Sequence, residues 1–436
     1  MLSRRRFLSL ASALPVPSRS AVPISAADDS FLEDLSRRAF LFFWEQSDSH
    51  TGLVLDRVGT AGAQNVSRSV DVASTALTGF FLTAMCIGSE RRWMDPEEIR
   101  KRVRNSLRHF AYEQDHVRGF YYHFVNRKTG KRAWNCELST IDTALFLAGV
   151  VTAHQYFKDE PEILTLASAI YQRVDFAWML DERTGWLRKG WNPETGFLSG
   201  EWNNYSENAI FHILAIGSPT FPVPLRCWYL FDREEIEFGG YRYVGRGPLF
   251  THQYSHAWLD LAGRRDGPPF QIDYFQNSVL ATYAHRAYCL ALRAMYPAYA
   301  DDLWGITASD SEVGYVIWGS PTSRRYVDGT VVPCAAGGSL MLAPEICLPV
   351  LHNMYHQFGE YVYGRYGFAD AFNPLTLWVN PDIVGLDAGI TLLSAENLRT
   401  GRIWEWFNSA QCVQRAMNQI FESRTYSAPR SLPIIR

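Results

Sequence analysis

Residues 138–157 read LSTIDTALFLAGVVTAHQYF, and they indicate the class of fold more clearly than any other stretch of the chain. Apolar residues recur there at positions i, i+3, i+4 and i+7, which is the spacing of one face of an α-helix. Ser139 and Asp142 have the spacing of a capping box, in which side chains satisfy free backbone N–H groups of the first turn. The stretch therefore predicts a long helix with a carboxylate at its N-terminal end.

The same periodicity recurs along the chain from about residue 30 onward. It predicts further helices at 31–46, 70–87, 96–113, 160–180, 206–216, 224–231, 274–296, 339–358, 389–397 and 408–423. The segments between some of them are long and rich in aromatic residues: 114–137, 181–205, 232–273 and 302–338. Loops of such length usually carry function, and short strands are expected within them, for example at Gly119–Val125.

About twelve helices, without a Pro/Ser-rich linker or a change in composition, predict one all-α domain. No repeat of fixed period is present, which disfavours a solenoid. Helix pairs closed into a ring, as in an (α/α)6 barrel, fit the number of helices. Other all-α arrangements fit the periodicity equally well, so the pattern alone leaves the ring open.

The composition is that of a large globular protein. Of 436 residues, 47% are hydrophobic and 20% charged, which excludes a disordered chain, a coiled coil and a collagen-like rod. The formal net charge is -3 and no dense Lys/Arg run occurs beyond the extreme N-terminus, so a nucleic-acid surface is not expected. Aromatic residues make up 14% of the chain, and such an excess suits a cleft that stacks against sugar rings.

The N-terminus resembles an export signal. Residues 3–8 read SRRRFL, followed by a short apolar stretch to Val16 and by small residues at 25–27, which is typical of a twin-arginine signal. The apolar stretch is shorter than the roughly 20 residues that span a bilayer, so no stable membrane anchor is expected. We predict that the twin-arginine machinery exports the chain and that residues 1–27 are removed. The mature protein, residues 28–436, would lie in the periplasm or be secreted, and losing four arginines would change its net charge from -3 to -7.

Familiar metal and cofactor motifs are absent from the sequence. The seven cysteines are scattered, without CxxC or Cys/His spacing for a metal, and most are expected to be buried apolar side chains. His252 and His256 are spaced i, i+4, but HEXXH and an evident third ligand are missing, so hydrogen bonding to a polar substrate is the favoured interpretation. GxSxG, P-loop and Rossmann fingerprints do not occur. We therefore predict neither a metal nor a cofactor, and leave disulfide pairing open.

Three carboxylates share a position at the start of a predicted helix: Asp142, Glu207 and Asp387. Capping alone explains the first two, because Ser139 and Asn204 each stand three residues before the acid. In a ring of helix hairpins, however, the inner helices begin at one mouth, and the three acids would meet in one pocket. One carboxyl group that donates its proton and another that activates water are what cleavage of a glycosidic acetal requires. The proton donor must then be desolvated or crowded by like charge.

Several stretches, in order, resemble the glucoamylase-like family of glycoside hydrolases, the group that contains bacterial endo-β-1,2-glucanases. They cover most of residues 135–407 and are Trp202–Glu207 with Leu214–Pro219, Thr251–Asp260 with Phe275–Ser278, Trp304–Asp310, Asp328–Thr330 through Gly337–Ser339, Tyr366–Asn373, and Gly385–Gly389 with Glu396, Asn397, Gly401 and Trp404. The resemblance implies an (α/α)6 barrel, export, and hydrolysis of a glucan, β-1,2-linked in that group, with inversion.

The resemblance also implies roles for individual residues. Glu207 is similar to the general acid, and Asp142 and Asp387 to acids across the cleft, one of them the base or the group that orients its water. The side chains expected to contact substrate are Glu137, Trp191, Trp202, Tyr205, His252, Tyr254, His256, Asp273, Asn277, Trp318, Asp370 and Asn373. The family commonly has Asp-Gln-Gly-Pro where this chain has Asp387-Ala388-Gly389-Ile390, which affects the expected linkage and chain-length preference more than the chemistry.

Two other activities use a pocket of this kind. A transglycosylase would pass the glycosyl unit to a second sugar, and a sugar-binding protein would hold the oligosaccharide without turnover. A polysaccharide lyase is disfavoured, because elimination from a uronate calls for cationic groups around the substrate. The presence of all three acids favours a hydrolase over a binding protein.

Overall fold

The computed structural model describes residues 24–60, 71–323, 326–422 and 434–435. This part of the chain is mostly helical, and 3-10 turns lie at Phe176–Met179 (η1), Leu249–His252 (η2) and Ser255–Ala257 (η3). The α-helices are α1 Ala26–Gln46, α2 Thr75–Glu90, α3 Pro96–Tyr112, α4 Thr140–Tyr156, α5 Pro161–Gln172, α6 Ala209–Ile216, α7 Arg226–Leu230, α8 Tyr274–Ala291, α9 Pro333–Gly337, α10 Pro344–Val362, α11 Gly385–Arg399, α12 Arg402–Asn408 and α13 Gln411–Ile420.

The strands are short and form small sheets of two or three members. They are β1 Ile24–Ser25, β2 Val54–Leu55, β3 Arg57–Gly59, β4 Val72–Ser74, β5 His116–Val117, β6 Phe120–Tyr121, β7 Phe124–Asn126, β8 Leu138–Ser139, β9 Gly190–Asn192, β10 Gly196–Phe197, β11 Glu235–Phe238, β12 Tyr241–Val244, β13 Ala308–Ser311, β14 Gly314–Ile317, β15 Tyr363–Gly364, β16 Gly367–Phe368, β17 Phe372–Asn373, β18 Trp378–Val379, β19 Asp382–Val384 and β20 Ile434–Ile435.

The prediction of a mostly helical chain is confirmed, and each predicted helix has a counterpart. The main differences are at helix ends: the stretch 160–180 divides into α5 and η1, and the stretch 339–358 becomes helical only from Pro344, which occupies the first turn of α10. Two helices, α9 and α12, were not predicted. They have 5 and 7 residues, which is too short for an apolar periodicity to repeat.

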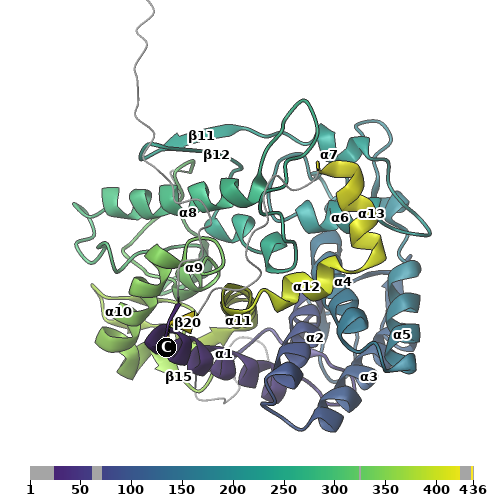
Figure 1. Ribbon diagram of the computed structural model, residues 1–436, viewed down its shortest axis with the longest axis horizontal. Helices are drawn as coiled ribbons and strands as arrows, with labels where there is room; N and C mark the ends of the chain where they lie inside the picture. The colour runs from purple at the N-terminus through teal and green to yellow at the C-terminus, as the bar shows by residue number, and fades with distance from the viewer. Residues whose placement is uncertain (1–23, 61–70, 324–325, 423–433, 436) are drawn as a thin grey trace, which may run out of the picture.

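Helices that are far apart in sequence alternate between the centre and the outside of the molecule. In Figure 1, α8, α10, α1, α3 and α5 follow one another around the periphery, and α11, α2 and α4 lie nearer the middle. The helix α2 packs against both α4 and α11, and α4 in turn packs against α6. The central helices are apolar on nearly all faces, and most residues of α2 and α4 are buried.

Glycines allow the close approach of α2 and α4. A Cβ at Gly79 would collide with the carbonyl oxygen of Leu145, and a Cβ at Gly149 would collide with the carbonyl oxygen of Gly79. Each helix thus presents bare backbone to the other at this crossing. The contact holds the two helices rigidly, and with them the position of their first turns.

Short strands lead directly into three central helices. Strand β4 ends one residue before α2, β8 ends one residue before α4, and β19 ends one residue before α11. Each strand pairs with a neighbour that comes from a loop: β4 with β7, β8 with β9, and β19 with β3. The small sheets therefore fix where these helices begin, which is where the predicted carboxylates stand.

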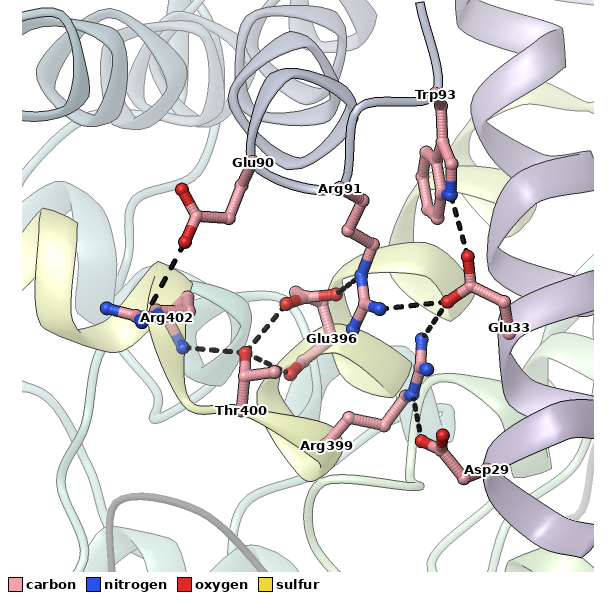
Figure 2. A network of polar contacts seen from close by, with 9 residues as sticks. All are labelled: Asp29, Glu33, Glu90, Arg91, Trp93, Glu396, Arg399, Thr400 and Arg402. Atoms are coloured by element: carbon pink, nitrogen blue, oxygen red, sulfur yellow. Dashed lines mark hydrogen bonds and ion pairs between the residues drawn. The ribbon is translucent and has the colours of Figure 1, made fainter. Parts of the chain in front are cut away.

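The opposite ends of α2 and α11 are joined to α1 by a network of ion pairs (Figure 2). Arg91, which follows α2, contacts Glu396 Oε2 through Nε at 2.6 Å and Glu33 Oε2 through Nη1 at 2.8 Å. Arg399 contacts the same Glu33 oxygen at 2.8 Å and Asp29 at 2.7 Å. The Trp93 indole donates to Glu33 Oε1 at 2.7 Å. The network connects the first helix of the described chain to two central helices.

The predicted twin-arginine motif lies outside the described residues, but the predicted cleavage region is partly described. Ile24 is buried, and Ser25 is the N-cap of α1, accepting a hydrogen bond from the Asp28 backbone N–H at 3.1 Å. Cleavage directly before Asp28 would remove this cap, so the exact boundary stays a prediction. Among the described residues, no helix combines the length and the apolar character needed to cross a membrane.

All seven cysteines lie in the described part of the chain, and all are free thiols. Five are buried, namely Cys86, Cys227, Cys289, Cys334 and Cys347. The prediction that most are buried apolar side chains is confirmed.

Candidate active site

A cavity of about 240 Å³ opens at the N-terminal ends of the central helices. Asp142 comes from the first turn of α4, Asp387 from the first turn of α11, and Glu207 from the segment two residues before α6. The lining residues are Arg57, His123, Ile141, Asp142, Leu145, Glu207, Phe250, Tyr254, Ala308, Ser309, Asp310, Tyr315, Asp370, Val384, Leu386 and Asp387. The three acids predicted to meet are thus brought together from positions 245 residues apart in sequence.

Glu207 has the environment of a proton donor. Its Oε2 is buried and has no hydrogen-bond partner among the described residues. Burial raises the pKa of its carboxyl group, and the charge of Asp142 raises it further. The predicted capping box with Asn204 is wrong, because α6 begins at Ala209 with Asn208 as N-cap; the Glu207 carbonyl oxygen accepts from Ser255 Oγ at 2.7 Å. The side chain is therefore available for chemistry.

Asp142 is both a capping residue and part of the cavity wall. Ser139 Oγ accepts from the Asp142 backbone N–H at 3.2 Å and donates to the Asp142 carboxylate, so Ser139 caps the helix as the predicted capping box requires of it. The other carboxylate oxygen, Oδ1, lies 3.5 Å from Nε2 of His123. One carboxylate oxygen is thus held by the N-terminal cap of α4, and the other faces the imidazole.

Asp387 lies against a second acid, Asp370. Burial raises the pKa of Asp387 well above its ordinary value, and the charge of Asp370 and their mutual hydrogen bond raise it further. Asp370 Oδ2 accepts from the Asp310 backbone N–H at 2.9 Å and from Asn380 Nδ2 at 2.6 Å, which leaves Asp387 to carry the shared proton. Asp387 Oδ2 has no hydrogen-bond partner in the described part of the chain. The pair can therefore offer both a donor and an acceptor to a sugar hydroxyl.

Arg57 brings a positive charge to the cavity wall. Its guanidinium contacts Asp310 Oδ2 at 2.6 Å and Asp56 Oδ2 at 3.0 Å. It lies on β3, which pairs with β19 immediately before α11, so it is held close to the Asp370–Asp387 pair. Its ion pairs within the described residues are with Asp56 and Asp310, and its charge acts on Asp387 as well, lowering the pKa of that carboxyl group against the effect of burial.

Of the side chains predicted to contact substrate, Tyr254 and Asp370 line the cavity, and Glu137 lies directly behind its wall. Four others have structural partners elsewhere, and their prediction as substrate contacts is not supported. Asp273 caps α8 by accepting from the Gln276 N–H at 3.0 Å. Asn277 bonds both backbone groups of Val244 at 2.7 and 2.9 Å, which ties β12 to α8.

The other two are a tryptophan and an asparagine in the loops. Trp318 is 1% exposed and donates to Ser309 Oγ at 2.7 Å. Asn373 donates to the Asp328 carbonyl oxygen at 3.2 Å and accepts from the Leu375 N–H at 2.9 Å. The polar groups of both side chains form hydrogen bonds that stabilise the loops in which they lie.

The predicted aromatic wall around Glu207 is largely a packing cluster. Trp202 is buried and donates to Thr140 Oγ1 at 2.9 Å. Tyr205 is 2% exposed, with its ring centroid 4.8 Å from that of Tyr274. Trp191 packs against Trp178 at 5.6 Å within the β8–β9–β10 sheet. None of these three lines the cavity, because the loop turns their rings into the core.

His252 and His256 are likewise buried and lie outside the cavity lining. Their i, i+4 spacing is not helical, since they belong to the separate turns η2 and η3. Burial lowers the pKa of His252 to about 3 and that of His256 to about 4, so both are neutral. His256 Nε2 contacts Ser278 Oγ at 3.0 Å. The structure thus places both side chains in the packed interior, and their predicted contact with substrate stays a prediction.

Sequence reasoning missed six polar or aromatic residues of the cavity: Arg57, His123, Phe250, Ser309, Asp310 and Tyr315. Asp310 and Phe250 lie in or next to stretches that carried the family resemblance, so a signal was present there. Tyr315 is 64% exposed on β14 and faces the cavity mouth. Arg57 lies on the short strand β3 and His123 lies between β6 and β7, with no motif around either, and only the folded chain brings them to the site.

One group of side chains has the compactness of a metal site. Potential ligand atoms of His123, Glu137 and Asp142 all lie within 4.8 Å of one another. Both carboxylates, however, already contact the imidazole of His123, at 3.0 and 3.5 Å. An ion-paired cluster accounts for the grouping, and we assign no metal to it.

Comparisons with known proteins show which proteins this chain is similar to. The model of a family described as "Putative glucoamylase" matches residues 199–411. The predicted resemblance to the glucoamylase-like family is confirmed. A solved protein described in the same words, from Bacteroides caccae, is 29% identical, with a TM-score of 0.84 over 91% of this chain and all of that one. The endo-β-1,2-glucanase of Chitinophaga pinensis, solved with sophorotriose and glucose, is 26% identical, with a TM-score of 0.81 over 91% of this chain and 98% of that one.

A curated protein similar to this chain is an exo β-1,2-glucooligosaccharide sophorohydrolase acting at the non-reducing end, from Parabacteroides distasonis. It is 26% identical over 92% of this chain. The chain spans 59% of the length of that relative.

Proposed function

We propose that this protein is a glycoside hydrolase that cleaves β-1,2-linked glucan or its oligosaccharides. The observation that carries the proposal is Glu207: a carboxyl group whose pKa burial raises, with an unpartnered oxygen among the described residues, in one cavity with Asp142 and Asp387. The β-1,2 linkage is supported by the activities of the similar proteins from Chitinophaga pinensis and Parabacteroides distasonis. The fold we propose is an (α/α)6 barrel, in which α2, α4, α6, α9 and α11 contribute to the inner ring.

In this mechanism, Glu207 gives its proton to the glycosidic oxygen as the bond to the anomeric carbon breaks. A carboxylate on the other side of the cavity accepts a proton from the attacking water. Inversion requires room for that water between the two carboxyl groups, which in inverting enzymes are about 6.5–9.5 Å apart. Following the anomeric form of the first product by NMR distinguishes inversion from retention. Release of new reducing ends, without transfer to a labelled acceptor, distinguishes hydrolysis from transglycosylation.

The deciding variant is Glu207→Gln, which keeps the shape of the side chain and removes its proton. We expect kcat on β-1,2-glucooligosaccharides to fall about 10²–10⁴-fold, the usual contribution of a general acid, while oligosaccharide binding measured by calorimetry is retained. Glu194→Gln is the matched control, because Glu194 is exposed, pairs with Arg132 and lies outside the cavity lining. Near-normal turnover by Glu207→Gln would refute the proposal.

We also propose that the protein is exported through the twin-arginine pathway to the periplasm or beyond. The support is the SRRRFL motif and the short apolar stretch that follows it. N-terminal sequencing of the exported protein tests this and locates the cleavage point relative to Ser25.

A further inference from the structure

The two acids that could serve as base, Asp142 and Asp387, have different neighbours, and the difference involves a residue outside every motif of the sequence. His123 lies in the cavity wall between β6 and β7, with one ring nitrogen towards Glu137 and the other towards Asp142. We propose that His123 is a positioning residue that, held by Glu137, presents a positive charge to Asp142 and so makes Asp142 the base. This inference rests on the hydrolase proposed above.

The contacts at the two edges of the ring define its charge state. Nδ1 lies 3.0 Å from Glu137 Oε1, and Nε2 lies 3.5 Å from Asp142 Oδ1. Ionised carboxylates only accept hydrogen bonds, so an imidazole between two of them is best satisfied when both nitrogens carry hydrogen. The doubly protonated ring is the imidazolium cation.

The ring is also fixed in place by the backbone and by stacking. The His123 N–H donates to the Glu137 carbonyl oxygen at 2.9 Å, and its carbonyl oxygen accepts from the N–H of Thr75, the first residue of α2, at 3.0 Å. The neighbouring ring of Phe124 is stacked on it, with centroids 3.8 Å apart and planes 18° apart. The cation is therefore held at one position relative to the first turn of α4.

The charged groups around His123 come from three segments. Burial lowers its pKa, but the charges of Asp142 and Glu137, with a smaller contribution from Asp56, outweigh burial and raise the pKa to about 9. The imidazolium is thus present at neutral pH and is lost as the pH rises through about 9. Arg57, the other cation of the cavity, is engaged by Asp56 and Asp310.

Asp387 has a different neighbour, since burial and the like charge of Asp370 raise its pKa and outweigh the opposing charge of Arg57. A carboxyl group crowded in this way keeps its proton and is suited to donate a hydrogen bond to a substrate hydroxyl. The proton balance of the step follows. Water attacks the anomeric carbon and passes a proton to Asp142, and the electron pair of the breaking C–O bond stays on the glycosidic oxygen, which takes the proton of Glu207.

The first test is His123→Gln, which keeps a polar side chain of similar size without a permanent charge. We expect kcat to fall about 10²-fold, the lower end of the contribution of a general base, with KM changed much less. His154→Gln is the control, since His154 lies on the same helix as Asp142 but at its far end.

A second variant, Glu137→Gln, keeps the His123 ring and weakens its charge. Removing one of the two carboxylates lowers the pKa of His123 from about 9, so the alkaline limb of the kcat/KM profile should move to lower pH. A purely structural role for Glu137 would lower activity without moving this limb. This variant also tests the proposal if His123→Gln fails to fold.

The outcomes that overturn the inference are distinct from failure of the proposed function. If both variants have the wild-type kcat and an unshifted kcat/KM pH profile while Glu207→Gln is inactive, the role of His123 is refuted. The proposed hydrolase activity is not refuted by that result. Loss of wild-type activity in EDTA, restored by Zn²⁺ or Mn²⁺, would show instead that the cluster binds a metal. Activity of Glu207→Gln would refute the function itself.

Discussion

Acidic residues gather at both ends of the central helices, and their partners differ. At the N-terminal ends, Glu207, Asp370 and Asp387 line a cavity with carboxyl groups whose pKa values burial raises. At the C-terminal ends of α2 and α11, acids contact Arg91 and Arg399 (Figure 2). Acidic residues thus form the candidate active site at one end of the central helices, and form ion pairs that join the helices at the other end.

The two groups of acids make the stability of the fold depend on pH in opposite directions. Burial opposes ionisation of Glu33, but hydrogen bonds from Trp93 and Arg399 and the charge of Arg91 outweigh it and hold the Glu33 pKa below its ordinary value. Such a group stabilises the fold above its unfolded pKa, and this contribution is lost as the pH falls. Glu207 and Asp387 have raised pKa values, so their contribution is present at low pH and is lost as the pH rises through the folded pKa.

The comparison predicts that the paired end controls stability. Glu396→Gln keeps the shape of the side chain but leaves the buried edge of Arg91 without its 2.6 Å ion pair. We expect the free energy of unfolding to fall by about 3 kcal/mol, the lower end for breaking a buried pair, with kcat per folded molecule unchanged. Urea denaturation followed by circular dichroism measures the loss. A stable but inactive variant would contradict the division between the two ends.

The cavity end should behave in the reverse way. Asp387→Asn removes a carboxyl group that is costly to ionise, so we expect the variant to be inactive yet more stable than wild type at pH 8, by about 1 kcal/mol. Because the raised pKa of Asp387 makes wild-type stability decline with rising pH, the gain should shrink towards pH 4. Thermal melts across this range provide the measurement. Lower stability of the variant at pH 8 would mean that Asp387 is a structural ion-pair partner.

The smallest effect is expected at the solvent edge of the network. Arg402 pairs with Glu405 at 3.3 Å and with Glu90 at 3.8 Å, but its side chain is 45% exposed. Since exposed pairs contribute about 0–1 kcal/mol, Arg402→Ala should change the unfolding free energy by less than about 0.5 kcal/mol. A loss comparable to that of Glu396→Gln, in the same urea titration, would show that the network acts as one unit out to the surface.

Much of the site was predictable where local sequence determines local structure. The Ser139–Asp142 capping box and the position of Asp387 in a first turn follow from spacing within four residues, and both are present. Glu207 was predicted with a capping alternative, which the structure rejects because α6 begins later. His252 and His256 were predicted to contact substrate, but both are buried outside the cavity lining. The sequence around a histidine in an aromatic loop does not distinguish a side chain that faces a substrate from one that faces the core.

The sequence by itself determined which segments are helices and which carboxylates stand at their starts, because apolar periodicity and capping act over one or two turns. Only the tertiary structure decided which acids carry a proton. That depends on neighbours distant in the chain, such as Asp370 beside Asp387 and His123 beside Asp142, and on the burial of Glu207. The pKa of a carboxyl group is set by the charges within a few ångströms and by its desolvation, and neither exists until the helices have packed.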